Sequence, residues 1–595
     1  MARDYPNRNV LWAETLVDEL AAGGLTAACI APGSRSTALT VAFDAHDDVA
    51  TFSHLDERSA AFFALGRGRR TGEPTALVCT SGTAAANFHP AIIEANQARV
   101  PLLALTADRP PELRDSGANQ TIDQEKLYGS AVRWYRDLPE PEPTPRKLRR
   151  LRTDAARALA EATGSDAGPV HLNCPFRKPL EPTPVEGDVP ADWHEGDERA
   201  AVGRASGDPY VSRRQGRPSL ADPDLQELAT AVGDADSGLV LAGPADPTTL
   251  ADDDWSDAVA DLAAVTNFPL LADPLSGVRF GGHVEHRDDA AVIGGYDGYV
   301  HALDLDPDIV LRFGASVTSK PLRKALAGTD ARQVLVDPMG EWRDAEFVCS
   351  DLVVADPTAT ARSLAAAVDE RADAAGDPDV AAALVDAEAR YWRLVEEFLA
   401  DETPEGAIVH RVLAEAPDPA TVFVSNSMAV RDADRFGEPR AADHTVLANR
   451  GASGIDGVLS TAFGAGSATD EPLVVLTGDL AYYHDMNGLL ALARCGVDAT
   501  VVCVNNDGGG IFHLLPIESF DPPFTEQFVT PHGLDFEPTG ELYDLSFQRV
   551  PADEFEDAYR ESLAMDGTQV IEVPFDADAS HRARERFADS VADRL

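Results

Sequence analysis

The stretch Leu473–Phe512, LVVLTGDLAYYHDMNGLLALARCGVDATVVCVNNDGGGIF, constrains the fold of this chain more than any other. The apolar run Leu473–Leu476 has the length of a strand, a helical pattern follows it, and a second apolar run covers Ala499–Val504. Such a β-α-β unit sets two parallel strands side by side, so the turns after both strands lie at one edge of the sheet. Because open α/β sheets bind ligands at that edge, the stretch predicts a binding site there.

Two polar turns follow these strands. Gly478-Asp479 comes after the first strand, and Asn506 precedes a glycine run that starts at Gly508 after the second. A carboxylate, an amide oxygen and a backbone carbonyl suit a hard cation such as Mg²⁺, which takes its other ligands from a phosphate-bearing molecule. Either turn alone has the ordinary composition of a loop, since Gly, Asn and Asp dominate turns. Their position after consecutive strands favours a metal site of Asp479, Asn506 and Gly508.

Patterns along the 595 residues predict an α/β fold with three domains. The first covers residues 1–185, an acidic linker covers 186–225, a central Rossmann-like domain covers 226–370, and the third covers 380–595 after a polar stretch at 369–379. The first and third domains share the plan of strand, glycine turn, helix and strand, which indicates a weak internal repeat. The central domain lacks a G-x-G-x-x-G turn, so nothing in it indicates FAD.

Strands and helices can be placed from the apolar runs. Strands are predicted at Leu25–Ile30, Ala50–Ser53, Thr75–Cys79, Pro101–Thr106, Pro169–Asn173, Gly238–Ala242, Leu270–Ala272, Asp308–Phe313, Gln333–Val336, Leu352–Ala355, Thr421–Val424, His444–Leu447, Leu473–Leu476, Ala499–Val504 and Gln569–Val573. Helices are predicted around Leu11–Leu20 and Ala60–Gly66.

The charge of the chain excludes some classes of function. It has 100 acidic and 50 basic residues, for a net charge of −50, and only five of the basic residues are lysines. A nucleic-acid binder needs a basic surface, so that class is disfavoured. A hydrophobic content of 44% argues against disorder. We interpret the charge as adaptation to a salty cytoplasm, because molar salt shortens the Debye length to about 3 Å and weakens the self-repulsion.

The compartment can also be predicted. There is no apolar run long enough for a transmembrane helix, and the N-terminus lacks the pattern of a signal peptide, so we expect a cytoplasmic protein with no membrane partner. Six scattered cysteines without a C-x-x-C pair are typical of small buried residues in a reducing cytosol.

Several charged residues follow predicted strands. Glu57 begins a helix after the strand Ala50–Ser53, where an acid also simply complements the helix dipole. Four arginines lie in turns after strands, where guanidinium groups bind carboxylates in a bidentate manner: Arg35, Arg109, Arg431 and Arg450. Any single one is more often the partner of a surface ion pair. Four at carboxyl-end turns predict a cleft for an anionic substrate.

These turns resemble a known family. Gly478-Asp479 followed by Asn505-Asn506 is similar to the metal–diphosphate motif of thiamine-diphosphate (ThDP) enzymes, which usually have glycine where this chain has Leu480. In having leucine at this position, the chain resembles one branch of the family, the MenD transferases. These enzymes join 2-oxoglutarate to isochorismate in menaquinone biosynthesis. The resemblance spans nearly the whole chain in the pieces PGSRST, TSGTAAAN, LTADRPPEL, GANQTI, NRGASGIDG and NNDGGGIF.

The resemblance implies a fold and a set of site residues. The fold would be three doubly wound parallel-sheet domains: pyrimidine-binding, central and diphosphate-binding. Glu57 would activate the coenzyme by sharing a proton with its pyrimidine N1′, and Mg²⁺ or Mn²⁺ would bind at the metal site. The other implied residues are Arg431 and Arg450 for 2-oxoglutarate; Ser427, Gly451, Ser453, Ile455, Gly478, Gly508 and Ile511 for the coenzyme; and Ser34, Arg35, Arg109, Asn119, Gln120, Lys320 and Phe512 for isochorismate or the apolar wall beside it.

The resemblance also implies assembly. Glu57 would serve the diphosphate domain of a partner subunit, so the active form would be a homodimer or a dimer of dimers. Two alternatives remain. One is another ThDP-dependent carboligase or 2-oxoacid decarboxylase of the acetolactate synthase kind, and the other is a non-catalytic regulatory subunit with this fold.

Overall fold

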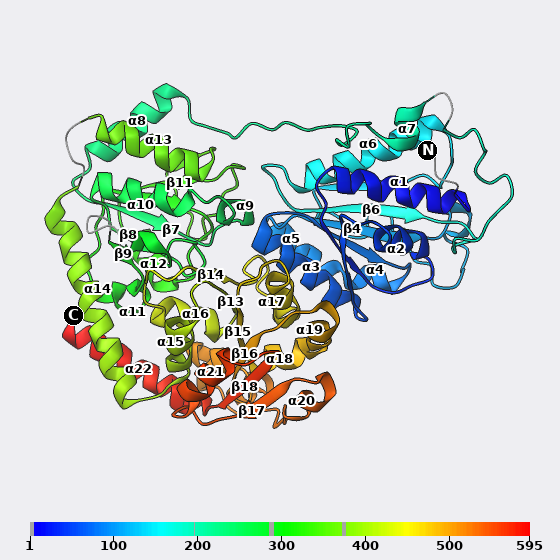
Figure 1. Ribbon diagram of the computed structural model, residues 1–595. Coiled ribbons are helices and arrows are strands. Elements are labelled where there is room, and N and C mark those ends of the chain that lie inside the picture. The colour runs from blue at the N-terminus through cyan, green and yellow to red at the C-terminus, as the bar shows by residue number, and fades with distance from the viewer. Residues whose placement is uncertain (1–4, 195–196, 285–290, 372–375) are drawn as a thin grey trace. The chain divides into compact units, whose positions relative to one another are not determined.

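The computed structural model describes residues 5–194, 197–284, 291–371 and 376–595. Its strands form three six-stranded sheets in which each strand is parallel to its neighbours (Figure 1). Helices surround the sheets, which confirms the predicted fold class. No helix in the described part of the chain is long and apolar enough to cross a bilayer.

The first sheet has the strand order β2-β1-β3-β4-β6-β5. Its strands are β1 (Ala27–Ile30), β2 (Ala50–Ser53), β3 (Thr75–Cys79), β4 (Leu102–Asp108), β5 (Trp134–Asp137) and β6 (Pro169–Pro175). Its helices are α1 (Arg8–Ala22), α2 (Thr37–Asp44), α3 (Glu57–Thr71), α4 (Thr83–Asn87), α5 (His89–Gln97), η1 (Pro111–Leu113), α6 (Pro145–Ala162) and α7 (Glu198–Val202). Helix α1 begins where the Asn7 side chain accepts the N–H groups of Asn9 and Val10, and its apolar face is buried against the sheet.

The central sheet has the order β12-β11-β10-β7-β8-β9. Its strands are β7 (Gly238–Ala242), β8 (Leu270–Ala272), β9 (Val292–Ile293), β10 (Ile309–Phe313), β11 (Arg332–Val336) and β12 (Asp351–Val353). Its helices are α8 (Asp222–Gly233), α9 (Pro247–Leu250), α10 (Trp255–Thr266), η2 (Gly282–Val284), α11 (Tyr296–Tyr299), η3 (Val300–Ala302), α12 (Lys320–Ala327) and α13 (Pro357–Asp369).

The third sheet, in the order β14-β13-β15-β16-β18-β17, repeats the topology of the first, which agrees with the predicted internal repeat. Its strands are β13 (Ala420–Val424), β14 (His444–Leu447), β15 (Leu473–Gly478), β16 (Thr500–Asn505), β17 (Ser546–Arg549) and β18 (Gln569–Pro574). The helical segments from residue 378 onward are α14 (Pro378–Asp401), α15 (Glu405–Glu415), α16 (Met428–Phe436), α17 (Val458–Gly466), α18 (Asp479–Asp485), η4 (Met486–Leu489), α19 (Leu490–Cys495), η5 (Gly510–Leu514), η6 (Pro516–Ser519), η7 (Phe524–Val529), α20 (Pro538–Tyr543), α21 (Phe555–Leu563) and α22 (Ala577–Arg594).

The structure differs from the sequence prediction in three strands and in the linker. Strands β5, β9 and β17 were not predicted, and each lies at the edge of its sheet. The predicted linker at 186–225 contains α7 and the first turn of α8, and it buries Trp193, Ala200 and Ala201 in the core of the first sheet. Because acidic residues dominate this segment, its composition did not indicate that these few apolar side chains pack into a core. Of the predicted polar stretch at 369–379, residues 372–375 lie outside the described residues.

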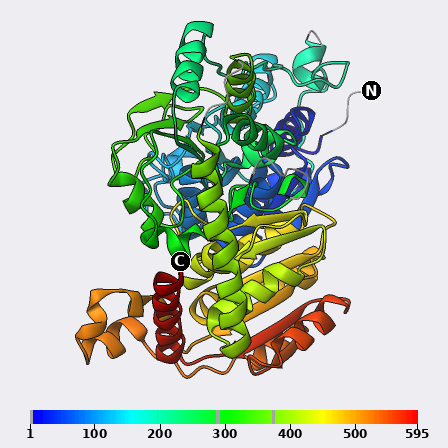
Figure 2. The same cartoon turned by 90° about the vertical axis from the view of Figure 1, so that its left-hand side faces the viewer.

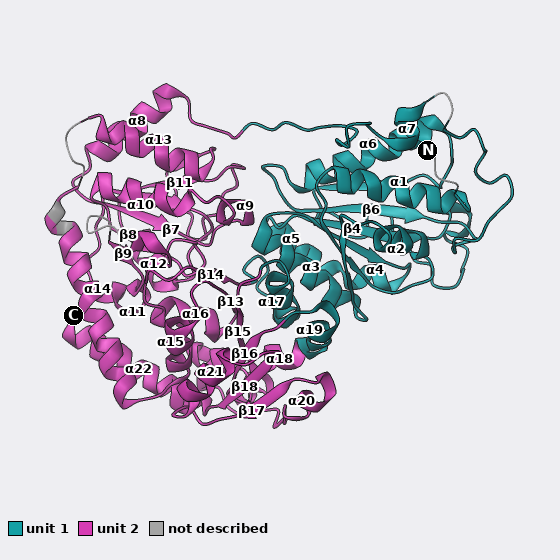
Figure 3. Cartoon of the chain, viewed as in Figure 1, with its two compact units in different colours: residues 1–216, 449–469, 485–497 teal, residues 217–448, 470–484, 498–595 magenta. Residues whose placement is uncertain are grey.

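Contacts divide the chain into two compact units that cross the predicted domain boundaries (Figure 3). Unit 1 comprises residues 1–216, 449–469 and 485–497, and unit 2 comprises 217–448, 470–484 and 498–595. Segments α17 and α19 of the C-terminal third therefore belong with the first sheet.

Glycines allow α17 to lie directly against α3 in unit 1. A Cβ on Gly66 of α3 would lie 1.9 Å from the carbonyl oxygen of Thr461, and a Cβ on Gly464 of α17 would lie 1.9 Å from that of Phe63. Since no side chain fits at either contact, the two backbones touch. Helix α3, which carries Glu57 at its start, is thus fixed along its length.

In unit 2, aromatic side chains join the central and third sheets. Helix α14 lies beside the C-terminal helix α22 (Figure 2), where Phe398 stacks on Phe587 with ring centroids 4.6 Å apart. Tyr391 and Phe436 also contact the Phe587 ring. One apolar core therefore continues from the central sheet to the third.

Four of the six cysteines are buried as predicted, whereas Cys349 and Cys495 are only partly buried.

Candidate active site

Glu57 is the first residue of α3 in unit 1. The Asp56 side chain caps this helix by accepting the N–H of Arg58 at 2.9 Å, and Gly72 ends it with a left-handed conformation. The Glu57 side chain is partly exposed. Burial raises the pKa of the nearby Cys79 thiol, and the Glu57 charge raises it further, which locates Glu57 close to the carboxyl end of β3.

The turns at the carboxyl edge of the first sheet are tied to one another. The Arg35 guanidinium donates to the carbonyl of Phe176 at 2.7 Å, and that of Arg109 donates to the carbonyl of Asn119 at 2.7 Å. Gln120 donates to the carbonyl of Ser81 at 3.0 Å. The predicted substrate residues Ser34, Arg35, Arg109, Asn119 and Gln120 thus share one edge of the sheet, at the ends of β1 and β4.

Asp108, which sequence reasoning missed, anchors this edge. Its carboxylate accepts the N–H of Arg109 at 2.7 Å and the side chain of Asn173 at 2.9 Å, and it pairs with Arg114 at 3.1 Å. Burial raises the pKa of this carboxyl above its ordinary value, while those hydrogen bonds and Arg114 oppose the rise. The signal in the sequence was an acid at the end of a fully apolar strand.

The turn that carries Arg450 is held by another residue that sequence reasoning missed, Glu94 on α5. Its carboxylate accepts three successive backbone N–H groups, from Gly451, Ala452 and Ser453. Ser453 adopts a left-handed backbone with a φ of 61°. Arg450 donates to the Ser453 hydroxyl at 3.3 Å. The predicted residues Arg450, Gly451, Ser453 and Ile455 therefore lie in one braced turn of unit 1.

In unit 2, Asp479 and Gly508 meet at the carboxyl edge of the third sheet. The two residues follow the paired strands β15 and β16, and the Gly508 N–H donates to Asp479 Oδ2 at 2.8 Å. The Asp479 carboxylate is almost fully buried. Burial raises its pKa above the ordinary value, and the hydrogen bonds from His532, Leu480 and Gly508 oppose the rise.

Asn506 has an unusual environment in the same turn. Its amide nitrogen donates to Glu405 at 3.1 Å, but its buried Oδ1 accepts no hydrogen bond among the described residues. Such an oxygen costs free energy unless a ligand occupies it. An amide oxygen and a carboxylate at adjacent strand ends are oxygen ligands suited to a hard divalent cation, so the residues fit the predicted metal site.

His532 is a further residue that the sequence analysis missed. Its Nε2 lies 3.1 Å from Asp479 Oδ2, and its Nδ1 accepts the N–H of Leu534 at 2.9 Å and lies 3.4 Å from Asp507 Oδ1. The ring therefore lies between the carboxylates of Asp479 and Asp507, and its Nε2–H tautomer would donate to Asp479. The signal was a lone histidine in the loop TPHGLDF, 53 residues after Asp479.

Ser427 and Arg431 lie on the neighbouring strand end. The strand order of the third sheet reverses between β13 and β15, which is where open α/β sheets bind ligands. Ser427 precedes α16 with a φ of 67°, a strained conformation for a residue with a side chain. Arg431, in the first turns of α16, donates to the Ser427 carbonyl.

The remaining predicted residues of unit 2 occupy separate elements. Ile511 and Phe512 lie in η5, where the Phe512 ring packs edge-on against Phe528. Lys320 is the exposed first residue of α12. Gly478 ends β15.

The equivalent crevice of the central sheet is closed by its own backbone. The strand order reverses between β7 and β10, and there Gly243 donates to the Phe313 carbonyl at 2.8 Å and Ala315 donates to the Pro244 carbonyl at 2.9 Å. A Cβ on Gly243 would lie 1.8 Å from the Ala315 oxygen. The turns after β7 and β10 therefore approach each other too closely for a side chain at position 243.

Comparisons with known proteins agree with this geometry. Residues 12–127 match the thiamine pyrophosphate enzyme N-terminal TPP binding domain, and residues 429–573 match the C-terminal TPP binding domain. The solved 4-hydroxybenzoylformate decarboxylase of Rhodococcus jostii RHA1, which is ThDP-dependent, has a similar fold, with a TM-score of 0.69 at 18% identity over 95% of this chain and 98% of that one.

Curated relatives are much more similar. The chain is 62% identical over 587 residues to the 2-succinyl-5-enolpyruvyl-6-hydroxy-3-cyclohexene-1-carboxylate synthase of Halobacterium salinarum, covering 98% of this chain and 99% of the relative. It is 61% identical over 600 residues to that of Haloarcula marismortui, covering 99% of each. It is 49% identical over 587 residues to that of Roseiflexus castenholzii, covering 96% of this chain and 97% of the relative.

Proposed function

The chain belongs to the family of 2-succinyl-5-enolpyruvyl-6-hydroxy-3-cyclohexene-1-carboxylate synthases, ThDP-dependent transferases of menaquinone biosynthesis, and we propose that it decarboxylates 2-oxoglutarate and adds the succinyl group to isochorismate. One observation carries the proposal. Asp479 and Gly508 meet at the switch-point edge of the third sheet, beside the unsatisfied amide oxygen of Asn506.

The metal and the coenzyme would be held at this edge. Asp479, the Asn506 Oδ1 and the Gly508 carbonyl would bind Mg²⁺ or Mn²⁺, and the cation would bind the diphosphate. Ser427, Gly451, Ser453, Ile455 and Gly478 would contact the coenzyme. When bound, ThDP supplies an electron sink for the electron pair that CO₂ leaves behind.

The other residues bind, orient and exclude water. Glu57 would share a proton with the pyrimidine N1′, which raises the basicity of the neighbouring amine. Arg431 and Arg450 would hold the carboxylates of 2-oxoglutarate as bidentate partners. Ile511 and Phe512 would keep water from the reacting carbon, so that addition to isochorismate is favoured over protonation.

Isochorismate is itself an anion, and the arginines of unit 1 suit it. Ser34, Arg35, Arg109, Asn119 and Gln120 share the edge of the first sheet and offer two guanidinium groups with hydroxyl and amide groups. Lys320 and Phe512 would also contact isochorismate.

Glu57 would act on the coenzyme of a second copy of the chain, in a homodimer or a dimer of dimers. Mixing two inactive variants, Glu57→Gln and Asp479→Asn, tests this. A mixed dimer has one site with both residues intact only if each site takes Glu57 from the other subunit. Recovered turnover in the mixture supports the shared site, and none contradicts it.

The reaction itself can be assayed directly. The purified chain in molar KCl with ThDP and Mg²⁺ should consume 2-oxoglutarate and isochorismate together and release CO₂. Pyruvate in place of 2-oxoglutarate separates the acetolactate synthase alternative. A regulatory subunit would show no turnover with either acid.

A further inference from the structure

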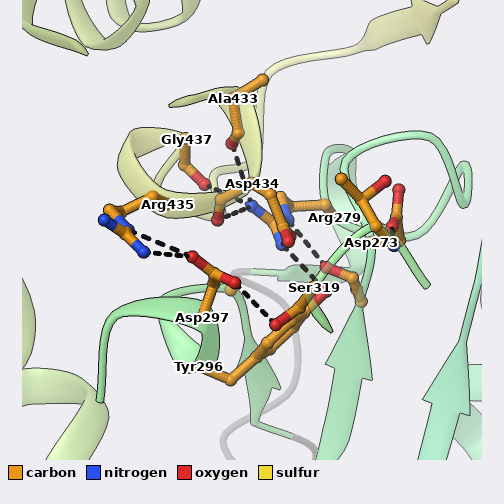
Figure 4. A network of polar contacts seen from close by, with 12 residues as sticks. Asp273, Arg279, Tyr296, Asp297, Ser319, Ala433, Asp434, Arg435 and Gly437 are labelled. Atoms are coloured by element: carbon orange, nitrogen blue, oxygen red, sulfur yellow. Dashed lines mark hydrogen bonds and ion pairs between the residues drawn. The ribbon is translucent and has the colours of Figure 1, made fainter. Parts of the chain in front are cut away.

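Helix α16 carries a second arginine besides the predicted site residue Arg431. Arg435 lies one turn after Arg431 on the same helix face. Both its Nε and its Nη2 donate to Asp297 Oδ2, at 3.0 and 2.8 Å, across to α11 of the central domain (Figure 4). The Asp297 side chain is 10% exposed and that of Arg435 is 26% exposed, so water screens this ion pair only in part. The position of α16 is therefore tied to Asp297.

The second oxygen of Asp297 is used as well. Asp297 Oδ1 accepts the hydroxyl of Ser319 at 2.7 Å (Figure 4). Ser319 is the N-cap of α12, and its Oγ accepts the N–H of Leu322 at 3.2 Å. Helix α12 begins with Lys320. One carboxylate thus connects the helix of Arg431 to the cap of the helix that starts with Lys320.

A buried arginine fixes the far end of α16. The Nη1 of Arg279 donates to the carbonyls of Ala433, Asp434 and Gly437 at 3.2, 2.9 and 3.2 Å (Figure 4). A cation at a helix C-terminus also complements the helix dipole. Its Nη2 donates to Asp434 Oδ1 and to the Tyr296 hydroxyl, next to Asp297. Arg279 therefore holds the last turn of α16, which includes Arg435, and Arg584 donates to Asp432 one turn earlier, so Asp297 is one of three side chains that anchor this helix.

We propose that Asp297 is a positioning residue that sets the helix of Arg431 and the helix of Lys320 in register with each other. It touches neither substrate. This inference rests on the proposed function, in which Arg431 binds 2-oxoglutarate and Lys320 binds isochorismate. Through this link, one carboxylate would align the side chain that binds 2-oxoglutarate with the one that binds isochorismate. Loss of the carboxylate should therefore weaken the binding of both substrates.

Four variants separate the contact with α16 from the contact with the cap of α12. Asp297→Asn removes the charge that Arg435 needs, and it should raise the KM for both substrates, each by roughly tenfold, as expected for misplaced binding groups. Arg435→Met should raise the KM for 2-oxoglutarate alone. Ser319→Ala should raise the KM for isochorismate alone, and Ser319→Thr, which keeps the hydroxyl, should restore it.

A matched control exists in the same domain. The Asp246 side chain is also 10% exposed and forms a two-bond ion pair with Arg343, at 2.8 and 3.0 Å. Asp246→Asn should leave both KM values unchanged. If Asp297→Asn lowers kcat or the yield of folded protein but leaves both KM values within about twofold of wild type, Asp297 is only a structural ion pair.

A readout without turnover keeps this inference separate from the proposed function. Amide hydrogen exchange should accelerate in both 320–327 and 428–436 in Asp297→Asn, but in neither segment in Asp246→Asn. Unchanged exchange in either segment overturns the proposed link. Wild-type protein that shows no turnover refutes the proposed function, and the exchange experiment still decides whether Asp297 joins the helices.

Discussion

The carboxylate of Glu94 accepts the backbone N–H of Gly451 at 2.8 Å, although the two residues are 357 positions apart in the chain. The same carboxylate accepts the N–H groups of Ala452 and Ser453 and pairs with Arg69 of α3 at 3.0 Å. It therefore links the helix that begins with Glu57 to the turn that carries Arg450.

Glu94→Gln should destabilise the protein and impair catalysis together. The variant removes the Glu94 charge from its buried ion pair with Arg69, and loss of one member of such a pair typically costs about 3–5 kcal/mol. We expect a fall of that order in the free energy of unfolding measured with urea, and a raised KM for 2-oxoglutarate. Glu161→Gln breaks the exposed pair with Arg157 and should change stability by less than about 0.5 kcal/mol. Equal stability of the two variants would contradict the role of Glu94.

Glu57→Gln should fold normally and lose nearly all turnover. The amide has the shape of the acid but cannot share a proton with the coenzyme, and loss of such a group typically costs about 10²–10⁴-fold in rate. Steady-state kinetics and thermal melting check both parts. Glu73→Gln, on an exposed residue just after α3, is the control and should keep wild-type turnover. Near-native turnover of Glu57→Gln would remove the assignment.

Asp479→Asn and Asn506→Ala should abolish the stabilisation that Mg²⁺ and ThDP give together. A ligand at about 100 times its Kd stabilises by about 2.7 kcal/mol, so the melting temperature of the wild type should rise when both are added. EDTA should remove the rise. Asp498→Asn, at the opposite end of β16, should respond as the wild type does. If the two site variants kept the full rise, the metal would bind elsewhere.

Asp485→Asn should change how stability depends on pH. The Asp485 carboxylate is buried, it accepts the N–H and the hydroxyl of Ser460, and burial raises its pKa to about 7. The folded protein keeps this proton up to about pH 7, whereas the unfolded chain loses it near pH 4. The contribution of Asp485 to stability is therefore fully present below about pH 4 and is lost as the pH rises through 7.

The amide imitates the protonated acid, so the variant should gain stability over the wild type between about pH 4 and 7. The gain is at most about 4 kcal/mol, from a shift of about three units at about 1.4 kcal/mol each. Urea unfolding at several pH values in constant KCl measures it. Asp470→Asn, on an exposed residue, should show a flat difference. A flat difference for Asp485→Asn as well would show that this carboxyl ionises normally.

The protein should become more stable as KCl rises from dilute to molar concentration. A net charge of −50 repels itself over a Debye length of about 30 Å at 0.01 M, and over only about 3 Å at 1 M. Thermal melting across a KCl series, with glycerol at matched viscosity as a control, measures this. A melting temperature that stays constant or falls would reject adaptation to salt.

Sequence patterns located the sheets well because buried parallel strands are short apolar runs. Ala50–Ser53, Thr75–Cys79, Gly238–Ala242, Leu270–Ala272 and His444–Leu447 were predicted with their observed bounds. The missed strands β5, β9 and β17 have the sequences WYRD, VI and SFQR, none of which contains an apolar run of strand length. The predicted helix after β15 is divided into α18, η4 and α19, and Gly488 of η4 lies too close to Ser460 for a side chain.

The site was predictable where it follows strand ends and unpredictable where it depends on distant partners. Asp479 and Gly508 could be paired because one β-α-β unit contains both. Glu94 and Asp297 could not, because nothing local to a glutamate in α5 or an aspartate in α11 indicates contact with residues 451 and 435. The role of such a buried acid becomes apparent only when the structure shows which cation or which N–H groups it pairs with.

The direct backbone contact at Gly66 and Gly464 limits how the gene can be divided to produce one unit alone. A fragment that stops at residue 216 would leave the contact face of α3 bare, since the segments that cover it are encoded after residue 448. Neither unit can be obtained by a single cut in the reading frame. Producing the first unit alone would require splicing three separate coding stretches together.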